Sequence, residues 1–254
     1  MQDVSKKIYF LSDFHLGAPT ADISLIREKK IISFLDSIKK NAAQIFIVGD
    51  MFDFWFEYRK VVPRGYVRIL GKLAELTDSG ISVHFFVGNH DMWMHDYFQK
   101  ELNIPVYHAP KTFLFGGKKF LVGHGDGLGP KDHKYKFMKR VFRSPASKWL
   151  FGKIPPVLGI GMADYFSQKS RAKTGNSDEV FLGEDKEWLI IYCKEILEKE
   201  HFDYFIFGHR HLPIDLQLND TSRYINLGDW INYDSYAVFE NDNLSLKYYE
   251  RNEE

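Results

Sequence analysis

Short apolar segments rich in β-branched and aromatic residues recur along the chain, and each ends in polar residues. Consecutive apolar positions over such a short length are typical of strands buried on both faces. We therefore predict five buried strands whose carboxyl ends carry polar side chains. The segments are KIYFLSD (7–13), QIFIVGD (44–50), SVHFFVGNHD (82–91), KKFLVGHGD (118–126) and DYFIFGHRH (203–211).

Helical patterns separate the first three of these strands. Apolar residues recur at helical spacing in ADISLIREKKIISFLDSIKK (21–40) and RGYVRILGKLAELTDSG (64–80), and Gly80 stands where a helix C-cap would. Strands that alternate with helices pair in parallel through right-handed crossovers. The first part of the chain therefore predicts an α/β layer.

The last fifty residues have a different pattern, in which apolar and polar residues alternate between turn residues. Alternation of this kind predicts antiparallel strands with one exposed face. We expect these strands to form a second sheet. They are IDLQLND (214–220), SRYINLGDW (222–230), SYAVFEND (235–242) and LSLKYYE (244–250).

Residues 130–175 interrupt the regular order of strands and helices. They mix Lys and Arg with Phe, Trp, Leu and Met, and contain only Asp132 and Asp164 as acidic residues. We predict a mostly helical insertion with a break at GKIPP (152–156). Two interpretations stay open: a solvated basic face with ordinary core contacts, or a cap over an active site that meets an anionic amphiphile or a membrane surface.

Composition limits the class of protein. A chain of 254 residues suits one domain, 1–254, and its formal net charge of zero gives no general attraction to nucleic acid. The single cysteine, Cys193, lies in a helical pattern and is expected to be buried and inert. We find no export signal and no apolar run long enough to span a bilayer, so we expect a cytoplasmic protein. The oligomeric state cannot be derived from these features.

The polar residues at the five strand ends are of metal-binding types. Carboxylate, amide and imidazole groups without thiolate favour Mn²⁺, Fe²⁺, Zn²⁺ or Mg²⁺, and so many ligands suit two ions. A pair of ions about 4 Å apart is the arrangement used for displacement at phosphorus. Hydrolysis of a phosphoester or phosphoanhydride is therefore predicted. The residues are Asp13, His15, Asp50, Asn89, His90, Asp91, His124, Asp126, His209 and His211.

In order along the chain, the blocks DFHLG (13–17), GDMFD (49–53), GNHD (88–91), GHGD (123–126) and GHRH (208–211) resemble the signature blocks of the calcineurin-like metallophosphoesterases. This resemblance implies a four-layer αββα sandwich of two mixed β-sheets, with residues 130–175 as a helical lid. It also implies a ligand set for two divalent ions, most often Mn²⁺. Asp13, His15 and His211 would hold one ion, Asn89, His124 and His209 the other, and Asp50 would bridge them.

Within that superfamily the chain resembles the UDP-2,3-diacylglucosamine pyrophosphatases of lipid A synthesis. The resemblance rests on GDMFDFWF (49–56), HGDGLGPKDHKY (124–135), LGDW (227–230) and the basic, aromatic insertion. It implies release of UMP and 2,3-diacylglucosamine 1-phosphate, a lid over the acyl chains, and peripheral contact with the cytoplasmic face of the inner membrane. The implied substrate contacts are Asn89, His90, Asp132, Tyr135, Lys169, Ser170, Arg171, Lys173 and His209.

One residue departs from the lipid A enzymes, because this chain has His90 where they typically carry Arg. Either the chain is a variant branch that retains His, or it is a related phosphodiesterase or phosphatase for soluble nucleotides or phosphoproteins. A noncatalytic scaffold is a third alternative, although such scaffolds usually lose ligands and none is missing here. We expect His90, held by Asp91, to protonate the leaving oxygen.

Overall fold

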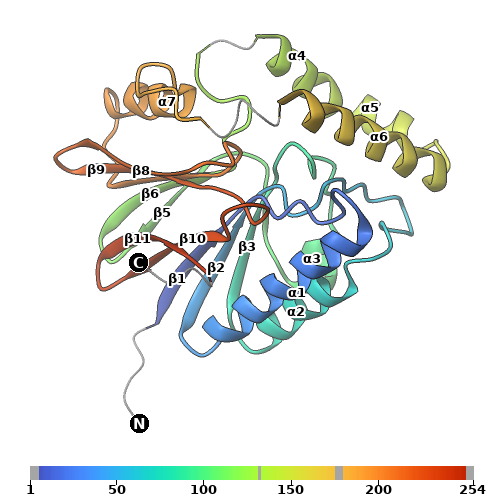
Figure 1. Ribbon diagram of the computed structural model, residues 1–254, viewed down its shortest axis with the longest axis horizontal. Helices are drawn as coiled ribbons and strands as arrows, with labels where there is room; N and C mark the ends of the chain where they lie inside the picture. The colour runs from blue at the N-terminus through green and yellow to red at the C-terminus, as the bar shows by residue number, and fades with distance from the viewer. Residues whose placement is uncertain (1–5, 131–132, 175–179, 250–254) are drawn as a thin grey trace.

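The computed structural model describes residues 6–130, 133–174 and 180–249, without the side chains of residues 164 and 168–174. Two β-sheets pack against each other, with helices outside them (Figure 1). The larger sheet has the strand order β11-β10-β1-β2-β3-β4 and the smaller one β5-β6-β7-β9-β8. The strands are β1 (Lys7–Leu11), β2 (Ala42–Val48), β3 (Ser82–Phe86), β4 (Val106–Tyr107), β5 (Lys111–Phe115), β6 (Lys118–Gly123), β7 (Tyr204–Phe207), β8 (Pro213–Asn219), β9 (Ser222–Leu227), β10 (Ser235–Glu240) and β11 (Asn243–Tyr248).

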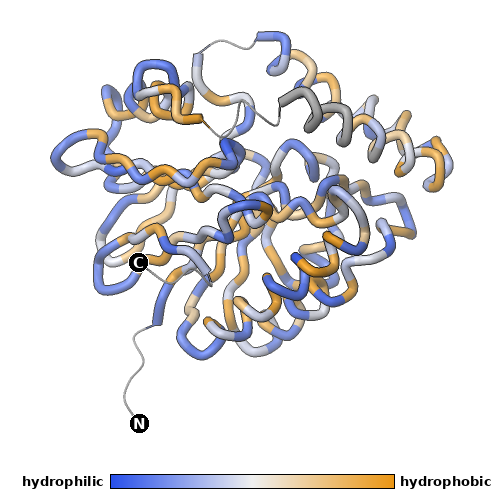
Figure 2. Tube along the Cα trace, viewed as in Figure 1, coloured by the Kyte–Doolittle hydropathy of each residue, from blue (hydrophilic) through white to orange (hydrophobic). Residues whose placement is uncertain are grey.

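Alternate residues of the central strands pack into different layers, which is the reason for the continuous apolar runs. In β1, Ile8 and Phe10 lie in the core between the sheets, whereas Tyr9 and Leu11 pack in the core under α1 to α3. A third core joins the smaller sheet to α7, where Cys193 is fully buried. The predicted four-layer sandwich is confirmed, and hydrophobic colour follows the strands of both sheets (Figure 2). The helices are α1 (Ala21–Ile38), α2 (Val67–Asp78), α3 (Tyr97–Leu102), α4 (His133–Phe142), α5 (Pro145–Phe151), α6 (Pro156–Thr174) and α7 (Trp188–Leu197).

The expectation that the last four strands share the second sheet is wrong for two of them. β8 and β9 pair antiparallel in the smaller sheet, but β10 pairs antiparallel with β1 in the larger one. The physical reason is that β10 is buried on both faces: Ala237 and Phe239 pack between the sheets, while Val238 packs in the helix-facing core. A strand that is buried on both faces is stable inside a sheet, and β10 pairs with the edge of β1 that β2 leaves open.

Helices α4, α5 and α6 form a separate group at one end of the sandwich (Figure 1), which we call the cap. The predicted helical insertion and its break are observed, because α5 ends at Phe151 and α6 begins at Pro156. The cap is fastened to the body by Phe151, whose ring centroid lies 4.5 Å from that of Trp93, and by a 2.8 Å hydrogen bond from Trp93 Nε1 to the carbonyl of Phe142. None of the described helices combines the length and the hydrophobicity of a membrane-spanning segment.

Candidate metal centre

The polar residues that follow β1, β2, β3, β6 and β7 meet at one end of the two sheets. The five strands belong to both sheets and not to a single open sheet, so the site lies where the carboxyl ends of two sheets converge. Several of these residues adopt a left-handed backbone conformation, which is costly for non-glycine residues and is concentrated at functional sites. The residues with this conformation are Asp13, His15, Asp50, His209 and His211.

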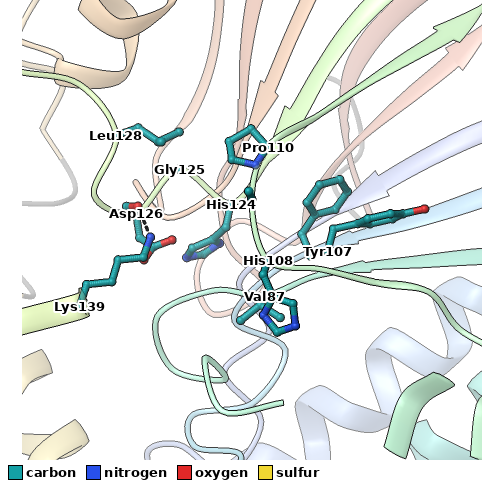
Figure 3. Close-up of a pocket in the computed structure, with 11 residues that line it drawn as sticks. Val87, Tyr107, His108, Pro110, His124, Gly125, Asp126, Leu128 and Lys139 are labelled. Atoms are coloured by element: carbon teal, nitrogen blue, oxygen red, sulfur yellow. Dashed lines mark hydrogen bonds and ion pairs between the residues drawn. The ribbon is translucent and has the colours of Figure 1, made fainter. Parts of the chain in front are cut away.

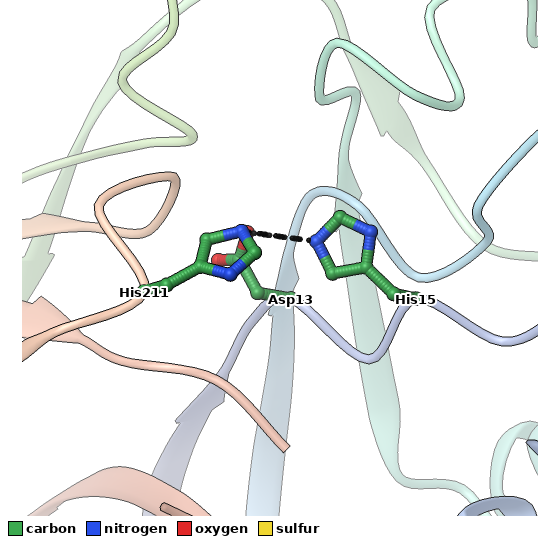
Figure 4. A group of neighbouring side chains, drawn as sticks. All are labelled: Asp13, His15 and His211. Carbon is green, nitrogen blue, oxygen red and sulfur yellow. Dashed lines mark hydrogen bonds and ion pairs between the residues drawn. The ribbon is translucent and has the colours of Figure 1, made fainter. Parts of the chain in front are cut away.

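One group of side chains comes from the loops after β1 and β7 (Figure 4). Asp13 Oδ1 lies 3.5 Å from His15 Nε2 and 3.3 Å from His211 Nε2, and the two ring nitrogens are 3.1 Å apart. Three donor atoms so close together, from residues nearly two hundred positions apart, can hold one cation.

A second group comes from the loops after β2, β3, β6 and β7. His124 Nε2 lies 3.3 Å from Asp50 Oδ2 and 3.1 Å from Asn89 Oδ1, and the ring of His209 is 5.1 Å from that of His124 between centroids. The opposite ring nitrogen, His124 Nδ1, is 2.8 Å from the carbonyl of Val48, which fixes the ring with Nε2 toward the centre.

Asp50 joins the two groups. Its Oδ2 atom lies 3.3 Å from His124 Nε2 and 3.8 Å from His15 Nε2. A carboxylate shared in this way can neutralise charge at both positions. The resulting arrangement is compatible with two neighbouring ion sites.

Asp13 and Asp50 each have one carboxylate oxygen that is held by a backbone N–H group and one that is left for a metal ion. Asp13 Oδ2 accepts a 2.9 Å hydrogen bond from the backbone N–H of His209, and Asp50 Oδ1 accepts one of 2.8 Å from that of His90. In each case the second oxygen is buried and has no hydrogen-bond partner among the described residues. Buried anionic oxygens without donors are costly, and a divalent cation would satisfy both of them. The donor set therefore fits divalent metal ions.

The imidazoles compensate part of this negative charge. Burial raises the pKa of Asp50, but the nearby His124 and His90 outweigh it and hold that pKa well below its usual range. Burial lowers the pKa of His124, and Asp50 more than reverses this, raising it to about 10. Carboxylates and imidazoles thus attract one another at the positions where cations would be held.

Glycine is required where the site loops approach one another. A Cβ atom on Gly88 would lie 2.1 Å from Asp50 Oδ1, and one on Gly49 would lie 2.4 Å from His124 Nδ1. No side chain fits at these distances, so both glycines allow the loops after β2, β3 and β6 to come together.

Asp229 belongs to the site although the sequence analysis gave it no role. Its Oδ2 lies 3.3 Å from His211 Nδ1, while its Oδ1 accepts hydrogen bonds from the backbone N–H groups of Ile231 and Asn232 at 3.1 and 2.8 Å. A carboxylate on the outer nitrogen of a metal-binding imidazole fixes the ring and raises its basicity. The only signal in the sequence is the LGDW block (227–230), which by itself indicates a turn.

The expected contact between Asp91 and the His90 ring is not formed. The Asp91 carboxylate accepts hydrogen bonds from the backbone N–H groups of Gly88 and Met51, at 2.7 and 3.0 Å, and so braces two site loops. The His90 ring instead places Nδ1 2.9 Å from the backbone carbonyl of Asp53. Burial lowers the pKa of His90 to about 4, so its ring is neutral near pH 7.

Of the other residues expected to contact the substrate, two of those with described side chains lie at the centre and one lies on the cap. Asn89 and His209 lie in the second ligand group, as described above. Tyr135 donates a 3.1 Å hydrogen bond to Asp126, which also binds Lys139 at 2.6 Å, so that α4 is tied to the loop after β6. Asp132 lies outside the described residues, as do the side chains of Lys169, Ser170, Arg171 and Lys173.

A small cavity beside the loop after β6 is lined by His108, Pro110, His124 and Asp126 (Figure 3). Its volume of about 20 Å³ suffices for a water molecule and not for a substrate. This cavity therefore does not hold a substrate, and Lys139 of α4 brings the cap to its edge through the contact with Asp126.

Comparisons with known proteins identify the family of the chain. The calcineurin-like phosphoesterase profile matches residues 6–213, and the chain belongs to this family. A Porphyromonas gingivalis protein named UDP-2,3-diacylglucosamine hydrolase is 42% identical over 95% of this chain and 97% of its own length. A Vibrio atlanticus protein with the same name is 25% identical over 95% of this chain and 96% of its own. An archaeal phosphodiesterase of solved structure aligns with a TM-score of 0.48 at 12% identity, over 95% of this chain and 98% of that one.

Membership of this family makes the chain a metal-dependent hydrolase, since the family implies divalent ions and the chain has the side-chain groups to hold them. The expectation of a phosphoesterase is thereby confirmed, and that of a noncatalytic scaffold is not supported.

Proposed function

We propose that the protein hydrolyses the pyrophosphate of UDP-2,3-diacylglucosamine, releasing UMP and 2,3-diacylglucosamine 1-phosphate in lipid A biosynthesis. Two facts support this substrate. The similar proteins from Porphyromonas gingivalis and Vibrio atlanticus are named as hydrolases of it. The second fact, an apolar surface on the cap beside the metal centre, carries the proposal.

The cap exposes large apolar side chains that a soluble substrate would not need. Val157 is 85% exposed and Trp149 64%, and similar residues recur along all three cap helices. Many exposed apolar residues on three neighbouring helices are typical of a ligand-binding or membrane-binding face. Two acyl chains would cover it. The exposed residues are Phe137, Met138, Val141, Phe142, Trp149, Leu150, Val157, Leu158, Met162, Tyr165 and Phe166.

We assign the residues the roles that their positions allow. We assign Asn89, His90 and His209 to contacts with the phosphoryl groups, and this is supported for His90 by its position beside the candidate ligands His15 and Asp50. A divalent pair, for which we propose Mn²⁺, would supply an activated water and neutralise the phosphoryl charge. The proposed ligands are Asp13, His15 and His211 at one position and Asn89, His124 and His209 at the other, with Asp50 shared.

We further propose one domain, 1–254, whose lid at about 130–175 rests on the cytoplasmic face of the inner membrane. Basic side chains of α4 lie next to the exposed aromatic residues, and this combination suits an anionic lipid surface. The same basic residues would meet the negative charge of the substrate. They include Lys136, Lys139 and Arg140, which line one pocket together with Arg143, the residue that follows α4.

The test is an assay of purified protein with Mn²⁺ and UDP-2,3-diacylglucosamine, in which UMP release is measured. A variant with Phe137→Ser and Trp149→Ser should raise KM for this substrate at least about a hundredfold, because burial of each ring stabilises the complex by roughly 1.5–3 kcal/mol. Hydrolysis of bis(p-nitrophenyl) phosphate should not change. The control is Val67→Ser, a position that is 71% exposed on α2. Turnover of the aryl diester without any UMP release would favour a generic phosphodiesterase.

A further inference from the structure

One residue of the cap reaches the metal centre. Ser167 lies on α6 and is only 9% exposed, whereas its neighbours Tyr165 and Phe166 are about 60% exposed. Its hydroxyl is directed into the body of the protein. It donates a 2.8 Å hydrogen bond to Asp53 Oδ2, and its oxygen lies 3.3 Å from His90 Nδ1.

Asp53 connects this serine to two imidazoles of the site. Its Oδ1 atom lies 3.7 Å from His15 Nδ1 and 3.7 Å from His90 Nδ1. Its backbone carbonyl lies 2.9 Å from the same His90 nitrogen. A carbonyl oxygen can only accept, so Nδ1 of His90 carries the proton. Nε2 is then the ring atom left to face a substrate, and in the neutral ring it accepts a hydrogen bond, for example from a water molecule held against the phosphoryl group.

The position of the His90 ring therefore depends on two parts of the chain. Asp53, in the loop after β2, holds Nδ1 through its carbonyl, and Ser167 contacts Nδ1 from the cap and fixes the Asp53 carboxylate. All three side chains are largely buried, so their hydrogen bonds are shielded from water. If α6 moved away from the body, the ring would keep the carbonyl contact and lose the second one.

We propose that Ser167 is a positioning residue that couples the seating of the cap to the orientation of the His90 imidazole. The inference rests on the proposed function only in assuming that His90 contacts the reacting phosphoryl group. The catalytic arrangement is then complete when α6 lies against the body, which is also the position in which the cap can cover a bound lipid. Ser167 itself does not touch the substrate in this account.

The test compares Ser167→Ala and Ser167→Thr with a serine elsewhere on the cap. Ser147→Ala is the control, since the Ser147 hydroxyl contacts Ser144 within the cap. For bis(p-nitrophenyl) phosphate, Ser167→Ala should lower kcat about tenfold and leave KM within about twofold, because a hydrogen bond to a charged group is lost. Ser167→Thr keeps the hydroxyl and should restore most of kcat. The aryl diester makes this result independent of the lipid substrate.

A double-mutant cycle tests whether Ser167 acts through His90. In a His90→Ala background, Ser167→Ala should change kcat by less than about twofold, because the ring that it positions is gone. Full additivity of the two substitutions would overturn the proposal. So would a Ser167→Ala variant whose kcat is unchanged on the aryl diester and whose KM for UDP-2,3-diacylglucosamine alone is raised, because Ser167 would then serve binding only. Failure of the proposed function would appear differently, as absence of UMP release in the wild type.

Discussion

The Asp229 carboxylate lies 3.3 Å from the Nδ1 atom of His211, behind the first ligand group of the centre. Asp229 is fully buried and is held in place by backbone N–H groups of the following turn. The pair shows that the orientation of the His211 ring depends on a residue eighteen positions further along the chain, and it gives the first prediction.

Asp229→Asn should weaken metal binding at this position by about 10–100-fold, because the imidazole of His211 loses its anionic partner. Titration calorimetry of Mn²⁺ into metal-free protein measures this directly. Asp234→Asn, which removes a carboxylate that pairs with Lys30 at 2.8 Å, is the matched control. Equal Mn²⁺ affinity in the two variants would show that Asp229 has no role at the centre.

Asp50→Asn should lower kcat about a thousandfold, because the negative charge shared by both ligand groups is removed and each step of 1.36 kcal/mol is tenfold in rate. Activity on bis(p-nitrophenyl) phosphate is the measurement. Asp36→Asn, on the exposed face of α1 where it pairs with Lys72, is the control and should remain active. Retention of a tenth of wild-type kcat would argue against a shared ligand.

Arg210→Met should lower the free energy of unfolding by roughly 3–5 kcal/mol, since it leaves the charge of Glu187 buried and unpaired. Arg210 donates to both Glu187 oxygens, at 3.0 and 3.1 Å, and to the carbonyl of Val180 at 2.6 Å. Urea unfolding checks this value. Arg223→Met removes the more exposed pair with Asp215 and should cost no more than about 1 kcal/mol. Similar losses of unfolding free energy in the two variants would contradict the prediction that the buried ion pair contributes more than the exposed one.

His84→Gln should reduce the loss of stability in acid. The ring stacks on Phe46, and burial together with Lys111 lowers its pKa to about 4. The folded-state pKa lies below the unfolded value of about 6.5, so the unfolded chain binds more protons between these values and stability falls as pH drops from about 6.5 to 4. The difference between the urea midpoints measured at pH 7 and pH 5 should be smaller in the variant than in the wild type. The control is His95→Gln, at an exposed position; an identical acid response in wild type and His84→Gln would contradict the prediction.

The sequence determined the layers of the fold and the chemistry of the centre. Apolar runs such as residues 44–50 specify strands buried on both faces, and the polar residue types that follow them specify a metal site, because both depend on local composition. The fold class and the phosphoesterase family followed from these blocks. The placement of β10 beside β1 did not, because its burial on both faces depends on partners more than two hundred residues away.

Tertiary structure alone decided which side chains support the ligands. Asp91 was expected at the His90 ring, yet it braces the backbone of Gly88 and Met51, and Asp53 holds the ring instead. A carboxylate next to a histidine in sequence looks a more suitable partner than a backbone carbonyl thirty-seven residues away, until the loops are folded. Hydrogen-bond partners depend on distances of a few ångströms, which side-chain type and spacing do not encode, and so only the packing of the loops could assign them.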